Sequence, residues 1–283
     1  MDNFEERTNA LSIDLEEWYQ PDLLKNAPTA KNSLVEKATD VLLNLLRKYN
    51  SKATFFVVGN VAKDNPRLIK RIYEESHEIS IHGLTHSQLH DIGPEGLQYE
   101  LAECKNILRG ILGNNVEIKG FRAPSFSLGK NTSWAIDILK KLQIKYDSSI
   151  FPVKNFFYGI NDVPLDIYGI SGNNINVPDA GSNLKEFPIT AFEFWKLRFP
   201  ISGGFFLRLI PIGMQLRLLK LINKKRPFII YVHPWECFKE TPKIKLSLLS
   251  SFITYYNIKS SLVKLEILLK NFKFDRIDKV LGV

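Results

Sequence analysis

The chain has 283 residues, 45% of them hydrophobic and 24% charged, with a formal net charge of +8. This length allows a large buried core, either as one barrel or as a domain with an extension. Cys104 and Cys237 form no CxxC pair, which excludes a cysteine zinc site and argues against a disulfide framework, and no apolar run approaches the roughly 18 residues of a membrane-spanning helix.

The N-terminal segment, residues 1–7, is acidic and polar and lacks the apolar run of a secretory signal. We therefore expect no signal peptide. The cysteine pattern favours a reducing compartment, so the sequence predicts a cytoplasmic protein.

Strands and helices are predicted to alternate from about residue 10 to residue 150. The expected strands are short apolar runs, and the expected helices carry apolar residues at helical spacing. Ser33 and Glu36 form a capping box that predicts the start of the first helix. The order is strand 11–13, helix 33–45, strand 53–58, helix 65–76, strand 78–81, helix 93–113, a strand before Arg122, helix 131–142 and strand 145–147. This alternation predicts an α/β fold with a parallel barrel.

The second half of the chain is less regular. Residues 151–200 are rich in Asn, Gly, Pro and Asp, so we expect loops with short strands such as 184–188. Long irregular segments over a barrel rim often shape a substrate cleft. A basic amphipathic helix over 214–223, a strand over 228–232 and a closing helix over 260–269 are expected to follow.

Five of the apolar runs end in residues that can do chemistry, namely Asp14, His82, Arg122, Asp147 and His233. The C-terminal ends of parallel strands meet on one rim, where α/β barrels build their active sites. An acid, an arginine and histidines on one rim predict a metal-assisted hydrolase.

Two histidines, His82 and His86, lie four residues apart. If this segment turns helically, both imidazoles lie on one face and can bind one divalent ion. Glycine follows the first histidine, which excludes the thermolysin-type motif. An isolated pair of this kind more often has no metal, but carboxylates that end another strand can supply a third ligand. These are Asp14, Glu16 and Glu17.

Charge is uneven along the chain. Residues 195–283 contain 17 Lys and Arg against 5 Asp and Glu, and residues 1–194 contain 21 against 25. A basic C-terminal third suggests an anionic partner, and the alternative of equal weight is a solvated basic surface. We expect no nucleic-acid binding because no reading motif accompanies the charge. One basic segment also contains the apolar residues Phe205, Phe206, Leu209 and Leu218. Its cations are Arg208, Arg217, Lys220, Lys224, Lys225 and Arg226. This combination predicts weak, salt-sensitive contact with the inner membrane face.

Several stretches resemble motifs of the polysaccharide deacetylase superfamily (NodB homology, carbohydrate esterase family 4). They are residues 11–19, 53–59, 77–83, 121–127 and 146–152. Residues 202–206 and 231–236 resemble the signature of a subgroup found with exopolysaccharide biosynthesis, which has an extra C-terminal region. The resemblance implies a distorted (β/α) barrel of about seven strands with a C-terminal extension packed on it. Residues 1–155 would be the N-terminal part of the barrel, and residues 156–283 its remainder plus the extension, in one structural unit.

The resemblance also implies a metal-dependent hydrolase. It would remove N-acetyl groups from amino sugars of a polysaccharide or its lipid-linked precursor and release acetate. One divalent ion, expected to be Zn²⁺, would be bound by an acid together with His82 and His86. Many family members have two adjacent aspartates in the first motif, whereas Leu15 follows Asp14 here. The acid ligand is then Glu16 or Glu17, and an extended strand favours Glu16.

The remaining roles implied by the resemblance concern proton transfer. Asp14 would be the general base, and Arg122 would orient it and hold it ionised. The backbone near residues 124–126 could add an oxyanion donor. His233 would be the general acid that protonates the departing amine, with Asp147 as the partner that tunes it.

Two other functions remain open. One is a metal-independent hydrolase of cyclic amides, similar to allantoinase, against which the intact His82 and His86 count. The other is a catalytically silent glycan-binding homologue, which the joint presence of Asp14, Arg122 and His233 disfavours.

Overall fold

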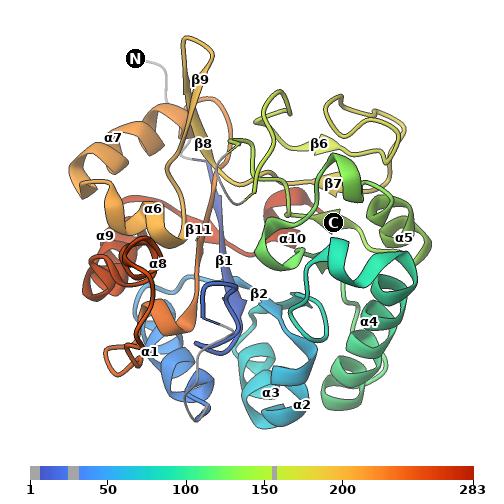
Figure 1. Cartoon of the computed structure of the whole chain (residues 1–283), viewed down its shortest axis with the longest axis horizontal. Helices are drawn as coiled ribbons and strands as arrows, with labels where there is room; N and C mark the ends of the chain where they lie inside the picture. Colours follow the sequence, from blue (N-terminus) through green and yellow to red (C-terminus); the bar gives the residue numbers. More distant parts are fainter. Residues whose placement is uncertain (1–6, 25–31, 155–157) are drawn as a thin grey trace.

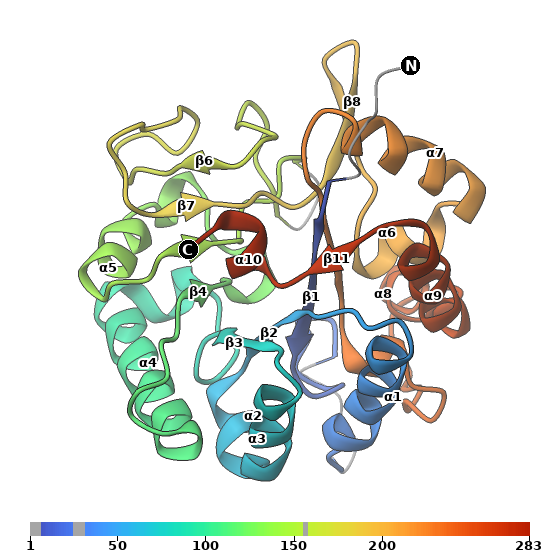
Figure 2. The same cartoon turned by 180° about the vertical axis from the view of Figure 1, so that it is seen from behind.

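The computed structural model describes residues 7–24, 32–154 and 158–283. Residues 1–6, on which the expectation of no signal peptide rests, lie outside the described residues. A curled β-sheet forms the centre of the molecule, and helices lie around its outer side (Figures 1 and 2).

The sheet has the strand order β10-β1-β2-β3-β4-β5-β7-β6, with β11 also paired to β1. All of these pairs are parallel except β6 with β7. The nine strands are β1 (Asn9–Leu15), β2 (Thr54–Val57), β3 (Glu78–Ile81), β4 (Gly120–Phe121), β5 (Tyr146–Asp147), β6 (Tyr168–Gly169), β7 (Lys185–Glu186), β10 (Ile229–Val232) and β11 (Phe274–Asp275). The predicted α/β barrel is therefore confirmed as a curled half-barrel, whose sheet has nine strands among the described residues where about seven were expected. A separate antiparallel hairpin consists of β8 (Ala191–Phe194) and β9 (Leu197–Pro200).

The longer helices start and end close to the predicted positions. In chain order the helices are α1 (Val35–Lys48), α2 (Gly59–Asp64), α3 (Pro66–Glu74), α4 (Leu89–Leu112), α5 (Ala135–Lys141), α6 (Gly204–Leu209), α7 (Ile212–Asn223), α8 (Leu248–Tyr255), α9 (Ser261–Asn271) and α10 (Ile277–Leu281). Helix α4 is kinked at Gly93, which has a φ of 66°. The sequence does not predict α6, because paired glycines at its start are more typical of a loop.

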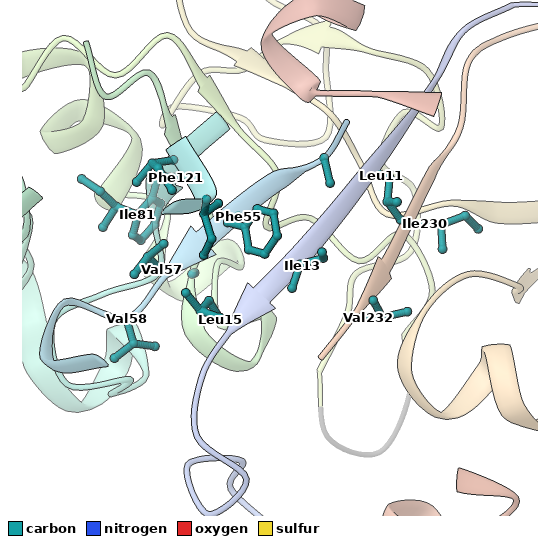
Figure 3. Packing of buried hydrophobic residues seen from close by; sticks show 14 of the residues in the cluster. Leu11, Ile13, Leu15, Phe55, Val57, Val58, Ile81, Phe121, Ile230 and Val232 are labelled. Atoms are coloured by element: carbon teal, nitrogen blue, oxygen red, sulfur yellow. The ribbon is translucent and has the colours of Figure 1, made fainter. Parts of the chain in front are cut away.

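Residues of β1 alternate between the two faces of the sheet. Leu11, Ile13 and Leu15 pack with apolar residues of β2 and β10 in the main core, as Figure 3 shows. Successive side chains of a strand point to opposite faces, so Ser12 and Asp14 face the inside of the curled sheet. The alternation thus directs an acidic side chain inward at the C-terminal end of the central strand.

The predicted capping box at Ser33 is wrong. Helix α1 has Leu34 at its N-cap, with no capping side chain from that residue. Instead the Glu17 carboxylate accepts hydrogen bonds from the Ser33 hydroxyl and from the Leu34 backbone N–H. A carboxylate from another segment satisfies the open N–H groups of the helix just as a local cap would.

The C-terminal region packs beside β10, and part of its positive charge is buried. Arg208 is 2% exposed and donates to the backbone carbonyls of Ile253, Thr254 and Tyr256. Lys264 donates to three carbonyls at the end of α6. Arg208 was expected on a basic surface, and that expectation is wrong because its guanidinium ties α6 to α8.

No helix in the described part of the chain is long and apolar enough to cross a membrane. Both cysteines, Cys104 and Cys237, are buried and free of disulfide bonds.

Candidate active site

Three predicted metal ligands come together at the C-terminal edge of the sheet. Ligand atoms of Glu16, His82 and His86 all lie within 4.8 Å of one another, and all three residues are buried. His86 Nε2 lies 2.7 Å from Glu16 Oε2, and the two imidazole centroids are 5.0 Å apart. The structure thus brings His82, His86 and Glu16 together.

The histidines meet through a loop rather than the expected helical turn. Gly83 has a φ of 74° and His86 a φ of 63°, so the backbone twice enters the left-handed region. The Leu84 backbone N–H and the Thr85 hydroxyl donate to Glu100 of α4 at 2.7 and 2.6 Å, which holds the loop. A non-glycine residue in this conformation costs about 1–3 kcal/mol and is typical of functional sites.

The two candidate acids on β1 have different surroundings. Glu16 N–H donates to the Asp14 carbonyl at 3.1 Å, so the chain turns sharply after the strand. The Glu16 carboxylate faces His86 and accepts a bond from Trp235 Nε1 at 3.1 Å. Glu17 is instead engaged at the start of α1. The geometry therefore selects Glu16 as the acid of the triad.

Asp14 is held by a fully buried arginine. Arg122 Nη1 donates to Asp14 Oδ1 at 2.6 Å and to the Ser12 hydroxyl at 2.9 Å. The rest of the guanidinium donates to the Ser148 carbonyl and hydroxyl, and it lies 4.2 Å from the centre of the Phe56 ring. Asp14 Oδ2 lies 3.8 Å from His233 Nε2. Asp14 is therefore fixed through Oδ1, while its Oδ2 faces His233.

His233 follows β10 and pairs with an acid that the sequence did not single out. Its Nδ1 lies 2.7 Å from Glu236 Oε2, and Glu236 Oε1 lies 3.1 Å from the buried Arg208 guanidinium. Burial lowers the pKa of His233, but the carboxylates of Glu236, Glu16 and Asp14 outweigh it and raise that pKa to about 9. Burial raises the pKa of Glu236, but His233 and Arg208 outweigh it and lower that pKa to about 2. A protonated imidazole is thereby favoured at neutral pH.

The expected pairing of Asp147 with His233 is wrong. Asp147 ends β5 and accepts bonds from the Ser149 backbone N–H and hydroxyl at 3.1 and 2.6 Å. Burial raises the pKa of Asp147. Burial together with the neighbouring Asp147 charge raises the pKa of Glu186 well above its usual value, which favours the neutral form of Glu186. The Ser149 hydroxyl also accepts from the Ala123 N–H at 2.7 Å, so Asp147 braces the segment after Arg122.

The three buried residues fit a divalent ion by their donor chemistry. His82 Nδ1 lies 2.8 Å from the Arg122 carbonyl oxygen, so it donates there and leaves the Nε2 lone pair available. Burial and the neighbouring His86 lower the pKa of His82 well below its usual value, which favours the neutral ligand form. Burial lowers the pKa of His86, yet Glu16 raises it overall, so the site favours positive charge beside this carboxylate. One carboxylate with two imidazoles is a donor set that zinc prefers.

A cavity of about 270 Å³ opens onto these groups. Its lining includes Asp14, Glu16, His82, His86 and His233, with apolar walls from Phe126, Tyr158, Phe205 and Tyr231. Gly203 packs against Tyr231 so closely that an added Cβ would lie 2.0 Å from the ring, and its φ is 71°. A glycine at position 203, directly before α6, is therefore needed for that helix to approach the site.

Sequence reasoning missed three site residues. Glu236 and Trp235 follow His233 directly, and Arg208 comes from α6. The indole of Trp235 stacks on the His233 ring at 5.6 Å and also donates to Glu16. In the sequence, Trp235 and Glu236 are marked only by their proximity to His233 within residues 231–236, and Arg208 has no such signal.

Comparison with known families divides the chain into two parts. Residues 28–146 match the family model described as polysaccharide deacetylase, and residues 148–282 match a model described as a domain of unknown function, DUF3473. A chitooligosaccharide deacetylase of Sinorhizobium fredii is 33% identical over 86 residues, which are 30% of this chain and 40% of the relative. A peptidoglycan-N-acetylglucosamine deacetylase of Bacillus cereus is 36% identical over 67 residues, which are 24% of this chain and 32% of the relative. The chain thus spans less than half the length of these two relatives.

Solved structures share the fold at low sequence identity. A putative polysaccharide deacetylase from Mycobacterium smegmatis superposes with a TM-score of 0.60 and 16% identity, covering 100% of this chain and 91% of the other. A CE4 family pseudoenzyme from Bacillus anthracis gives a TM-score of 0.52 and 15% identity, covering 98% of this chain and 66% of the other. At this identity the likeness concerns the fold.

Proposed function

We propose that this chain, which carries a polysaccharide deacetylase domain of the NodB-homology (CE4) type, is a metal-dependent glycan N-deacetylase. Its substrate would be an N-acetylated amino sugar of a polysaccharide or a lipid-linked precursor. Its products would be acetate and the free amine. The names of the curated relatives, which act on chitooligosaccharide and on peptidoglycan N-acetylglucosamine, support this substrate class.

The observation that carries the proposal is the joint position of two groups around one cavity. The candidate ligands Glu16, His82 and His86 lie on one side. The acid–base candidates Asp14 and His233 lie 3.8 Å apart beside them. Amide hydrolysis needs an electrophilic centre, a base for the attacking water and an acid for the leaving amine.

We propose Zn²⁺ as the ion held by Glu16, His82 and His86. When bound, such an ion supplies Lewis acidity to the amide carbonyl and makes water a better nucleophile at neutral pH. Asp14 takes the proton from the attacking water, since Arg122 occupies one of its oxygens and leaves Oδ2 available. The backbone around Ser125 and Phe126, which have φ of 53° and 52°, borders the cavity and is the candidate for oxyanion contact.

His233 completes the reaction as general acid. Glu236 engages Nδ1, so Nε2 is the nitrogen that faces Asp14 and Glu16. The C–N bond breaks as Nε2 gives its proton to the departing sugar amine. This role replaces the expected Asp147 partner with Glu236.

The subgroup resemblance of residues 202–206 and 231–236 supports a role in exopolysaccharide biosynthesis, which we propose together with a cytoplasmic location. The metal-independent alternative does not account for a buried Glu16 beside two histidines. The silent alternative does not account for the complete set of acid and base candidates, although the fold also occurs in a pseudoenzyme.

Acetate release tests the proposal. We expect the purified protein to release acetate from N-acetylchitooligosaccharides, to stop after chelation and to recover with added zinc. His82→Ala should lose both bound metal and activity, whereas His90→Ala, which changes an exposed histidine outside the cavity, should keep both. Opening of allantoin by metal-free protein, without acetate release, would favour the alternative hydrolase.

A further inference from the structure

Helix α8 presents apolar side chains to solvent directly beside the candidate active site. Leu248 is 93% exposed, Leu249 59% and Phe252 46%, and Tyr256 continues the same face. Residues 248, 252 and 256 repeat at intervals of four, which places them on one side of the helix. We call Leu248, Leu249, Phe252 and Tyr256 the apolar stripe.

The apolar stripe is continuous with the cavity wall. Phe252 lies 5.5 Å from the ring centre of Phe205, and both Phe205 and Ile253 line the cavity. Arg208 binds the carbonyls at the end of α8 and also pairs with Glu236. The stripe is therefore fixed relative to the catalytic candidates rather than carried on a loose loop.

Lysines flank the apolar stripe in the sequence. Residues 239–259 contain Lys239, Lys243, Lys245 and Lys259 against one acid, Glu240. All four lysines are exposed. Exposed leucines and aromatic residues bordered by lysines are typical of surfaces that lie in the interface of an anionic bilayer. A sugar chain is a poorer match, because the aliphatic Leu248 and Leu249 offer no flat ring on which a sugar can stack.

A second exposed apolar group lies at the tip of the β8–β9 hairpin. Trp195 is 86% exposed and Leu197 62%. Figure 1 shows the hairpin projecting at the top, where β1 begins, whereas the cavity lies where β1 ends. Arg198 of this hairpin is engaged by Glu193 and the Val163 carbonyl. The hairpin therefore offers one exposed cation, Lys196, against the four exposed lysines of residues 239–259, and it lies at the opposite end of β1 from the cavity.

We propose that the apolar stripe and its lysines dock the protein on an anionic bilayer, with the cavity mouth at the membrane surface. This docking proposal rests on the proposed deacetylation. It implies that the substrate is a glycan carried by a lipid in that bilayer.

Vesicle sedimentation tests the docking without requiring catalysis. The wild-type chain should bind phosphatidylcholine vesicles that contain phosphatidylglycerol, bind pure phosphatidylcholine weakly, and detach with added salt. Leu248→Ser/Leu249→Ser should weaken binding at least about tenfold, because the bilayer no longer takes up two leucines. Lys243→Gln/Lys245→Gln should weaken it about fivefold per lysine, hence about 25-fold.

The matched control is Trp195→Ser/Leu197→Ser, which removes exposed apolar surface at the hairpin and should bind as wild type does. Unchanged binding of the leucine variant, loss of binding in the hairpin variant, or no wild-type binding would each overturn the docking proposal. The proposal would also be overturned if the wild-type chain bound no vesicles but formed a dimer, and the leucine variant were monomeric. Acetate release from soluble N-acetylchitooligosaccharides should be equal in all variants. Its absence in wild type would refute the proposed function while leaving vesicle binding to be judged on its own.

Discussion

At the scale of single residues, the pairing of His233 with Glu236 defines the chemistry of the site. The two side chains are three residues apart, joined by the short turn Pro234–Glu236. Arg208 compensates the charge of the buried Glu236, so the acid can stay ionised beside the imidazole. In the proposed reaction this acid acts through His233 and is a positioning residue.

We predict that Glu236→Gln lowers kcat more than it raises KM. Without the carboxylate, the pKa of His233 falls, so the basic limb of the kcat profile moves to lower pH. Asp147→Asn is the control and should leave that limb in place, although it can lower stability. A basic limb that moves with Asp147→Asn and stays with Glu236→Gln would contradict this assignment.

We also predict that substitution of Glu16 impairs metal binding, whereas substitution of Glu17 impairs stability. Glu16→Gln should weaken zinc binding at least about 100-fold, because a ligand is lost. Glu17→Gln should keep one zinc per chain but lose about 1 kcal/mol of stability at the start of α1. Metal analysis and thermal unfolding of both variants decide the matter, and metal loss in Glu17→Gln alone would reverse the assignment.

Residue types on the rim were predictable because strand ends are visible as apolar runs that stop at a polar residue. Asp14, His82, Arg122 and His233 were found in this way. The partner of His233 was not, because Asp147 and Glu236 both lie near strand ends. Only the turn after β10 decides which carboxylate reaches the imidazole.

At the scale of elements, a buried polar cluster links the start of β3 to the C-terminal helix α10. Glu78 accepts from the Thr54 hydroxyl and from the Asp278 N–H, and Ile277 N–H donates to Thr54. Burial, with the nearby Asp278 charge, raises the pKa of Glu78 to about 7. The C-terminal segment is thus held to the sheet by an acid that favours its neutral form.

This cluster predicts a pH-dependent stability. The folded-state pKa of Glu78 lies above its unfolded value of 4.5, so its contribution is complete below pH 4.5 and is lost as pH rises through about 7. Glu78→Gln should therefore gain on wild type by about 3 kcal/mol between pH 4.5 and pH 8, taking 1.36 kcal/mol per pKa unit as an upper limit. Urea unfolding at several pH values measures the difference, and parallel curves for the two proteins would contradict the cluster's role.

The observed boundaries of α1, α3 and α7 lie close to the predicted ones, because the apolar residues of these helices recur regularly at helical spacing. The histidine loop was mispredicted because spacing alone does not distinguish a helical turn from a loop held by Glu100. Helix α6 was missed for a similar reason, since its glycines serve close packing on Tyr231.

At the scale of the whole molecule, the two matched parts of the chain build one sheet. Strand β1 precedes both matched parts and pairs with β2 of the first and with β10 and β11 of the second. The first part supplies His82 and His86 to the cavity, the second supplies His233, and β1 supplies Asp14, so the cavity needs both parts and β1. Helices α6 and α8 then add Phe205 and Ile253 to its wall. The open edge of the half-barrel and this added wall could not be predicted from local sequence patterns, because they depend on contacts between segments that are distant in the sequence.

The central claim is that an ion at Glu16, His82 and His86 and a base at Asp14 act together in N-deacetylation. Zinc titrated into metal-free protein, with acetate release from N-acetylchitooligosaccharides followed alongside, tests it most directly. We predict that wild-type activity rises until one zinc is bound per chain. Asp14→Asn should bind the same zinc while releasing acetate at least about 100-fold more slowly. Acetate release by metal-free wild type at the full rate, or loss of zinc binding in Asp14→Asn, would contradict it.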